Sequence, residues 1–208
     1  MRWVEVDAEA SWAREDARYR VFVFAGPSLD VSTADVVEAS VEQALDAART
    51  LSLHDEHLWS LALVELDARG KEGLVWLSGM DYARVPETQA QWRRRGEMQS
   101  RLLSARSRAG RPLLLPNGLR VLRMFPEWWP GSPLWETFSD DYRLPLDGLG
   151  LPPELCDALR RWNDAWSERA VEDPLPDEEA WTAEGLRLHA AVQRELAGVA
   201  EVRREFGP

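Results

Sequence analysis

The residues best suited to chemistry in this 208-residue chain are two histidines that flank two carboxylates. They form the run HDEH from His54 to His57, in which the imidazoles lie three positions apart. A zinc site needs at least three protein ligands, and the remaining histidine, His189, lies far along the chain on a predicted helix. A solvated loop between a helix and a strand explains the run without a metal. We therefore expect no metal site and no cofactor.

The common catalytic and phosphate-binding motifs are absent from the sequence. Neither phosphate-binding loop, G-x-x-x-x-G-K-[ST] or G-x-G-x-x-G, occurs. There is also no G-x-S-x-G nucleophile elbow and no kinase signature set. The single cysteine, Cys156, has no histidine near it in the sequence and suits a buried helix position better than a catalytic thiol. An enzyme is therefore the less favoured of two interpretations.

Charge is distributed very unevenly along the chain. Residues 84–123 contain ten arginines and two acids, a net charge of +8, whereas residues 1–83 carry −9 and residues 124–208 carry −10. An arginine-rich helix can bind an acidic partner or nucleic acid. The whole chain has a net charge of −11, however, and repels phosphate at long range. We expect these arginines to be neutralised by the chain's own acids, and we do not expect nucleic-acid binding.

Tryptophan is the most unusual residue type, with eleven copies. Three of them lie in the run LRVLRMFPEWWPGSPLW, residues 119–135, which begins like a strand and then contains three prolines. Proline donates no backbone hydrogen bond, so no regular ladder is expected through Trp128, Trp129 and Trp135. Neighbouring residues of an extended chain point to opposite sides, so the adjacent pair cannot easily face one core. We predict a binding site at Glu127, Trp128 and Trp129, with one indole of the pair exposed.

The predicted position of the third indole depends on a helix that follows this turn. Leu155, Leu159, Trp162 and Trp166 recur at helical spacing after Pro152 and Pro153. We expect Trp135 to be buried against this apolar stripe.

Periodicity along the whole chain predicts an α+β protein, with small antiparallel sheets and helices packed against them. The clearest strands form a hairpin around the polar segment DARGKEG. Strands are expected at residues 3–6, 19–25, 58–66, 74–80, 113–115, 119–125 and 199–206, the last as an edge strand beside 119–125. Helices are expected after a cap at Ser32 or Thr33, over 87–109, from Pro152 to Trp166, and from a cap at Asp177 to Leu196.

The character of the sequence changes at the proline-rich run, and this change predicts two modules. Residues 1–112 would form an N-terminal α+β module that contains the hairpin. Residues 113–208 would form a tryptophan-rich module of strand, helix, helix and strand. A chain of this length is compatible with two small domains.

The sequence contains no sign of membrane insertion or export. No run reaches the roughly 18 apolar residues of a membrane helix, and the start, MRWVEVDAEASW, lacks the pattern of a signal peptide. We therefore expect a cytoplasmic protein without a membrane partner. The oligomeric state is left open.

Two resemblances extend these expectations. The run 119–135, together with LCDALRRWNDAW and EEAWTAEGLRLHAAVQREL, resembles a C-terminal module of uncharacterised actinobacterial proteins. This resemblance implies a common fold and no particular activity. The N-terminal order of helix and hairpin, with the segment LALVELDARGKEGLVWLSG, is similar in layout to small immunity proteins that neutralise secreted toxins. That similarity carries over no functional residue.

The leading hypothesis is a non-catalytic protein-binding module, immunity- or antitoxin-like, whose acidic surface covers a basic site on a toxin. The alternative is an enzyme with a pocket walled by Trp128, Trp129 and Trp135. Its acid or base would be Glu127, Asp140 or Asp141.

Overall fold

The computed structural model describes residues 17–138, 143–170 and 172–207. Two small sheets and their helices make up this α+β fold, so the predicted class is confirmed. The strand expected at residues 3–6 lies outside the described residues. The elements follow the order β1 (Tyr19–Ala25), β2 (Asp30–Val36), α1 (Val41–Leu51), β3 (Leu58–Leu66), β4 (Glu72–Ser78), α2 (Gln89–Arg108), β5 (Arg120–Met124), β6 (Leu134–Glu136), η1 (Leu146–Leu149), α3 (Pro153–Ser167), α4 (Glu178–Glu195) and β7 (Ala200–Arg204).

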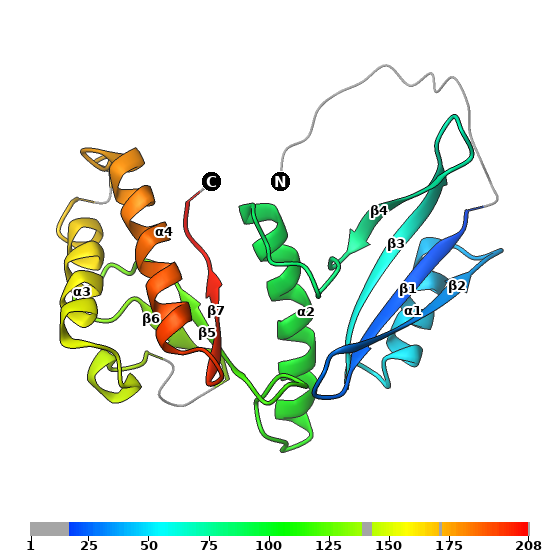
Figure 1. Cartoon of the computed structure of the whole chain (residues 1–208), viewed down its shortest axis with the longest axis horizontal. Coiled ribbons are helices and arrows are strands. Elements are labelled where there is room, and N and C mark those ends of the chain that lie inside the picture. Colours follow the sequence, from blue (N-terminus) through cyan, green and yellow to red (C-terminus); the bar gives the residue numbers. More distant parts are fainter. Residues whose placement is uncertain (1–16, 139–142, 171, 208) are drawn as a thin grey trace.

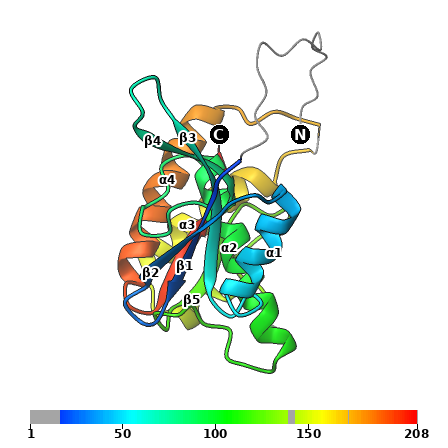
Figure 2. The same cartoon turned by 90° about the vertical axis from the view of Figure 1, so that its right-hand side faces the viewer.

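The first sheet is antiparallel, with the strand order β2-β1-β3-β4. Its strands can be followed in Figure 2, in which this half of the molecule faces the viewer. Helix α1 covers one face through Ala44 and Ala48, which are fully buried against residues such as Val21 and Leu61. Small side chains at these positions let the helix lie close to the sheet. The predicted hairpin is confirmed as β3 and β4.

Two expectations for the part of the chain before β5 are wrong. Residues 30–36 form strand β2, so neither Ser32 nor Thr33 caps a helix. The cap is Ser40, whose hydroxyl accepts from the backbone N–H of Gln43 in a capping box. The polar sequence DVSTADV gives little strand signal, and pairing with β1 makes it a strand. Residues 113–115 form no strand.

The second sheet has the order β6-β5-β7 and is mixed rather than purely antiparallel. The C-terminal strand pairs with β5 at the sheet edge, as predicted, but runs parallel to it. Helices α3 and α4 lie between these strands in the chain and form the crossover that parallel pairing requires. Strand β6 contains Trp135, so the prediction of no ladder there is wrong. The prolines fall in the loop between β5 and β6, outside the paired positions.

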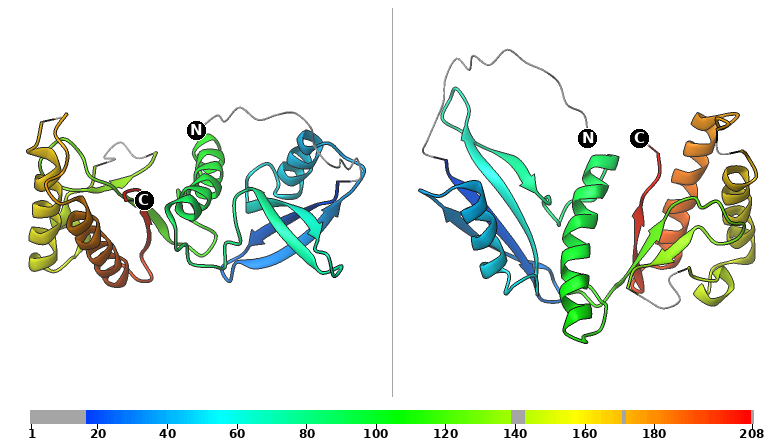
Figure 3. Two further views of the ribbon diagram at one scale, coloured as in Figure 1. Left: turned by 90° about the horizontal axis from the view of Figure 1, so that it is seen from above. Right: turned by 180° about the vertical axis from the view of Figure 1, so that it is seen from behind.

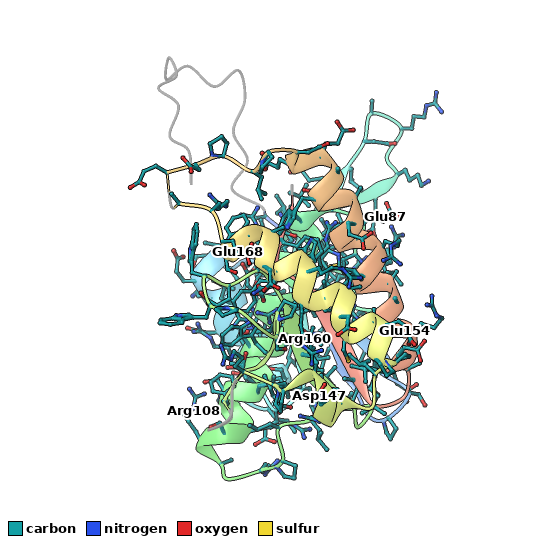
Figure 4. All side chains as sticks on the ribbon, turned by 90° about the vertical axis from the view of Figure 1, so that its left-hand side faces the viewer. Glu87, Arg108, Asp147, Glu154, Arg160 and Glu168 are labelled. Atoms are coloured by element: carbon teal, nitrogen blue, oxygen red, sulfur yellow. The ribbon has the colours of Figure 1, made fainter. Side chains whose placement is uncertain are left out.

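The core of this half is built around two stacked indoles, Trp162 of α3 and Trp181 of α4. Their ring centroids lie 4.5 Å apart. Each Nε1–H donates to the backbone carbonyl of the other tryptophan at 3.0 Å, so both polar atoms are satisfied inside the core. Gly185 makes the close packing possible, because a Cβ there would lie 2.6 Å from Phe206 and 2.9 Å from Trp162. On the outer side of α3, Figure 4 shows Arg160 beside Asp147, an ion pair of 2.8 Å.

Helix α2 lies between the two sheets (Figures 1 and 3). Its apolar side, including Met98 and Leu102, packs on Phe24 and Leu58 of the first sheet. On its other side Gly96 approaches Arg203 of β7, whose guanidinium Nη1 donates to the Gly96 carbonyl at 3.1 Å. A Cβ at Gly96 would lie 2.8 Å from that guanidinium carbon. The helix therefore contacts both halves of the chain.

A buried polar network around Glu201 of β7 connects the two halves. Arg95 of α2 donates to its carboxylate through Nε at 2.5 Å and Nη2 at 2.9 Å. Gln99 donates at 2.6 Å and the Tyr82 hydroxyl at 3.1 Å. Arg95 is thus paired within the chain, whereas Arg93 forms no ion pair with the described residues. The boundary at residue 112 stays a prediction.

His189 of α4 gives a prediction for the pH dependence of stability. Its Nε2 lies 2.8 Å from the Val202 carbonyl and its ring contacts Trp92 edge-on. Burial lowers the pKa of His189 below its ordinary 6.5; the hydrogen bond to Val202 opposes this effect, and the charge of Arg204 adds to it. As the pH falls through 6.5, the unfolded chain therefore binds a proton before the folded chain does, and stability decreases.

We expect the free energy of unfolding to fall between about pH 7.5 and about pH 5, and to fall less in His189→Gln. Urea unfolding of both proteins across this range measures the difference. Because His54 and His57 are present in both proteins, the comparison isolates His189. An identical pH dependence in the two proteins would contradict the prediction.

Candidate functional site

The sequence-predicted site forms an ordered aromatic turn, residues 125–129, that is held by a buried side chain. Asn163 of α3 is fully buried. Its Oδ1 accepts from the backbone N–H of Glu127 at 2.9 Å, and its Nδ2 donates to the Trp129 carbonyl at 2.9 Å. These two bonds fix the backbone on both sides of Trp128. The sequence did not indicate the role of Asn163, because a single asparagine inside an amphipathic helix forms no distinctive pattern.

The two adjacent indoles of this turn differ in exposure. Trp129 is 70% exposed, which agrees with the expectation that one of the pair is exposed. Trp128 is 37% exposed and lies beside Trp166 of α3, with ring centroids 5.6 Å apart. The guanidinium of Arg169 stacks over both of these rings, 4.6 Å from Trp128 and 4.1 Å from Trp166. The turn is therefore continuous with the end of α3.

Trp135 is buried as predicted, but its predicted neighbours are wrong. It stacks on Phe125 at 5.1 Å. In β6 its neighbour Leu134 is the residue that packs into the core with Leu159 and Trp162. Successive strand residues point to opposite faces, so Trp135 lies on the other face of the sheet. The short strand that the sequence did not indicate is the reason for this difference.

Beside the aromatic turn lies a groove with a volume of about 1060 Å³. The loop that follows β5, the end of α3, one face of α4 and the C-terminal segment contribute to it. Its apolar surface is made by Phe125, Trp166, Trp181, Leu186 and Phe206. We call it the acidic aromatic groove, because three carboxylates also line it: Glu178, Glu179 and Glu205.

The carboxylates of the groove occupy two different environments. Glu178 and Glu179 are exposed in the first turn of α4 and form no ion pair with the described residues. Glu205 is partly buried. Burial alone would raise the pKa of Glu205, but hydrogen bonds from Arg123 and Arg203 and their charges outweigh burial and hold the pKa below its usual value. Glu205 therefore stays ionised at neutral pH.

The sequence did not predict the acidic aromatic groove, although the spacing of some of its residues is visible there. Glu178, Thr182 and Leu186 recur every four residues and so share one face of α4. An exposed leucine on a helix face that begins with acidic residues is a weak indication of a binding surface. The other walls come from distant parts of the chain, which no local pattern connects.

The indoles of the enzyme hypothesis are not gathered around this groove. Asp140 and Asp141 lie outside the described residues. Trp128, Trp129 and Trp135 do not line the groove.

The HDEH run has structural contacts. Asp55 accepts from the Trp59 indole at 2.6 Å, and Glu56 pairs with Arg111. Within the described ranges, no group of three His, Cys, Asp or Glu side chains could hold a metal.

Comparisons with protein-family models, with curated proteins and with solved structures find no match for this chain. The resemblances to actinobacterial proteins and to toxin-immunity proteins therefore stay predictions. None of the described helices is long and apolar enough to cross a membrane.

Proposed function

We propose that this chain is a non-catalytic cytoplasmic binding protein that takes a basic, partly apolar segment of a partner protein into the acidic aromatic groove. The single observation that supports this proposal most is the combination of five large apolar side chains with the exposed carboxylates of Glu178 and Glu179 in one groove. A toxin with a basic active surface is the kind of partner that an immunity-like protein would cover.

The groove has the chemistry to bind arginine and lysine side chains. Their aliphatic stems pack on apolar surface while the charged ends reach carboxylates, and guanidinium groups stack favourably on tryptophan. Arg169 already stacks on Trp166, so the electron-rich face of this indole accepts a cation within the protein itself. A basic residue of the partner would find the same kind of surface next to Glu178 and Glu179.

Long-range charge supports a basic partner over an acidic one. Residues 124–208 carry a net charge of −10. A field of this sign attracts a positively charged surface and accelerates its association, with a strong dependence on salt.

The environment of Glu205 favours binding over acid catalysis. A general acid at neutral pH needs a carboxyl group with a raised pKa. Burial acts in that direction on Glu205, but the arginine partners lower its pKa below the usual value.

Binding of a synthetic peptide tests the proposal. The probe is a ten-residue peptide of alternating leucine and arginine, measured by isothermal titration calorimetry. We expect Leu186→Ala to weaken its binding by about fivefold or more, because the exposed leucine is part of the apolar surface. The matched control is Leu51→Ala, since Leu51 is an exposed leucine on α1 outside the groove. Equal affinity in Leu186→Ala and wild type would contradict the proposal.

The charged side of the groove is tested by Glu178→Gln combined with Glu179→Gln. We expect slower association and a weaker salt dependence, because exposed charges act mainly on the encounter. A peptide with glycine in place of leucine keeps the charge and should bind more weakly. If both peptides bind equally, only non-specific charge attraction is present, and the groove is not the site.

A further inference from the structure

Arg204, the last residue of β7, is a buried arginine that forms no ion pair with the described residues. It is 7% exposed, and its Nε is buried with no hydrogen-bond partner. Among the described residues it forms no side-chain hydrogen bond and no ion pair. Arg123 and Arg203, by contrast, both pair with Glu205. A buried charge without compensation destabilises a fold, so the position of Arg204 calls for a bound group of opposite charge.

Arg204 lines a hollow of about 420 Å³ between helix α2 and strand β7, which we call the Arg204 pocket. Gln89, Trp92, Arg93 and Ser100 of α2 line its other side. The volume is within the range of small-ligand sites, roughly 300–1000 Å³, and exceeds what one small inorganic ion fills. The pocket is distinct from the acidic aromatic groove, with Glu205 lining both.

The charged residues that line the Arg204 pocket have a net positive charge, which would attract an anionic ligand. Arg203 and Glu205 also line it, but they pair with each other. Glu97 lines it from the exposed side of α2 and has no ion pair with the described residues. Arg93 offsets that charge, which leaves Arg204 uncompensated.

The start of α2 adds to this excess. Its first turn contains no acidic residue, so the partial positive charge of the helix N-terminus is not neutralised there. Gln89, at the first helical position, has a buried Oε1 without a hydrogen-bond partner. A ligand with an oxyanion and a neighbouring hydroxyl or N–H group would satisfy both Arg204 and this amide.

We propose that the Arg204 pocket binds an oxyanion, a carboxylate or a phosphate, carried by a small molecule. The guanidinium of Arg204 is the primary contact, and Gln89 hydrogen-bonds a polar group next to the anion. Arg93 is a second cation in the lining, where it offsets the charge of Glu97. This site is separate from the groove proposed above for a basic partner.

Thermal unfolding with simple anions tests the assignment. Inorganic phosphate, acetate and chloride are compared on the full chain at constant ionic strength. We expect phosphate or acetate to raise the Tm saturably, by about 3 °C or more at ten times its Kd, and chloride to leave it unchanged. The anion that raises the Tm more shows whether the natural ligand carries a phosphate or a carboxylate. No rise with either oxyanion would overturn the proposal.

Arg204→Met separates a ligand site from an ordinary structural arginine. The variant removes the uncompensated charge, so we expect it to have a higher Tm than wild type without anion and no response to phosphate or acetate. Arg194→Met, at an exposed site on α4, makes the same charge change and should respond like wild type. A response of Arg204→Met equal to that of wild type, or a lower Tm without anion, would overturn the proposal.

A second variant keeps the test decisive if Arg204→Met does not fold. Arg93 is exposed, so Arg93→Gln should fold normally. We expect it to weaken binding of the effective anion by about two- to fivefold, as for one exposed charge. Unchanged affinity in Arg93→Gln would contradict the proposed second cation and count against the site.

Discussion

Trp162→Ala should lower the free energy of unfolding by about 3 to 5 kcal/mol, as expected for loss of a buried aromatic side chain. Trp162 stacks on Trp181, packs edge-on against Phe206 and donates to the Trp181 carbonyl. Removal of the indole leaves a cavity, and the Trp181 carbonyl loses its indole donor. Trp129→Ala is the matched control, because this indole is exposed, and it should cost about 0.5 kcal/mol or less.

Denaturant unfolding of the two variants separates the scaffold from the candidate site. A conservative variant, Trp162→Phe, keeps most of the ring volume but loses the Nε1 donor, and we expect an intermediate loss of about 1 to 3 kcal/mol. Similar severe losses for Trp162→Ala and Trp129→Ala would mean that the aromatic turn is part of the core. The predicted binding site at Glu127, Trp128 and Trp129 would then be wrong.

Glu201→Ala should also cost about 3 to 5 kcal/mol, because removing one partner of a buried ion pair leaves the other charge uncompensated. The side chains of Glu201 and Arg95 are each only 12% exposed. Gln99 and Tyr82 would lose the same acceptor. The control is Glu195→Ala, whose carboxylate lies on the surface of α4 and 3.8 Å from Arg194. It should cost about 0 to 1 kcal/mol.

A double-mutant cycle with Arg95→Met measures the pair itself. We expect the double variant to be less destabilised than the sum of the two single variants, since neither charge is then left buried alone. Strict additivity would show that the two side chains do not interact in solution. The same unfolding curves test the predicted boundary at residue 112, because the network joins residues on its two sides. A second unfolding transition in Glu201→Ala would support two modules.

The sequence alone was sufficient for the elements whose signal is local. Apolar spacing predicted α2, α3 and α4, and alternating or continuous apolar runs predicted β1, the β3–β4 hairpin and the edge strand β7. These signals are strong because each of these helices and strands buries one face, so its apolar residues recur with a regular spacing. The cap Asp177 was predicted for the same reason, since an N-cap bonds to its own first turn.

Only the tertiary structure decided the strands and sites that depend on distant partners. Strand β2 is polar and becomes a strand by pairing with β1, and β6 pairs with β5 only after the proline-rich loop folds back. Such hydrogen bonds leave no pattern in the sequence of the strand itself. The acidic aromatic groove likewise joins side chains of the loop after β5, of α3 and α4, and of the C-terminal segment. In the same way, the sequence shows Arg204 as one of 25 basic residues. Only its burial without an ion pair to a described carboxylate distinguishes it, because burial and pairing are properties of the packed chain.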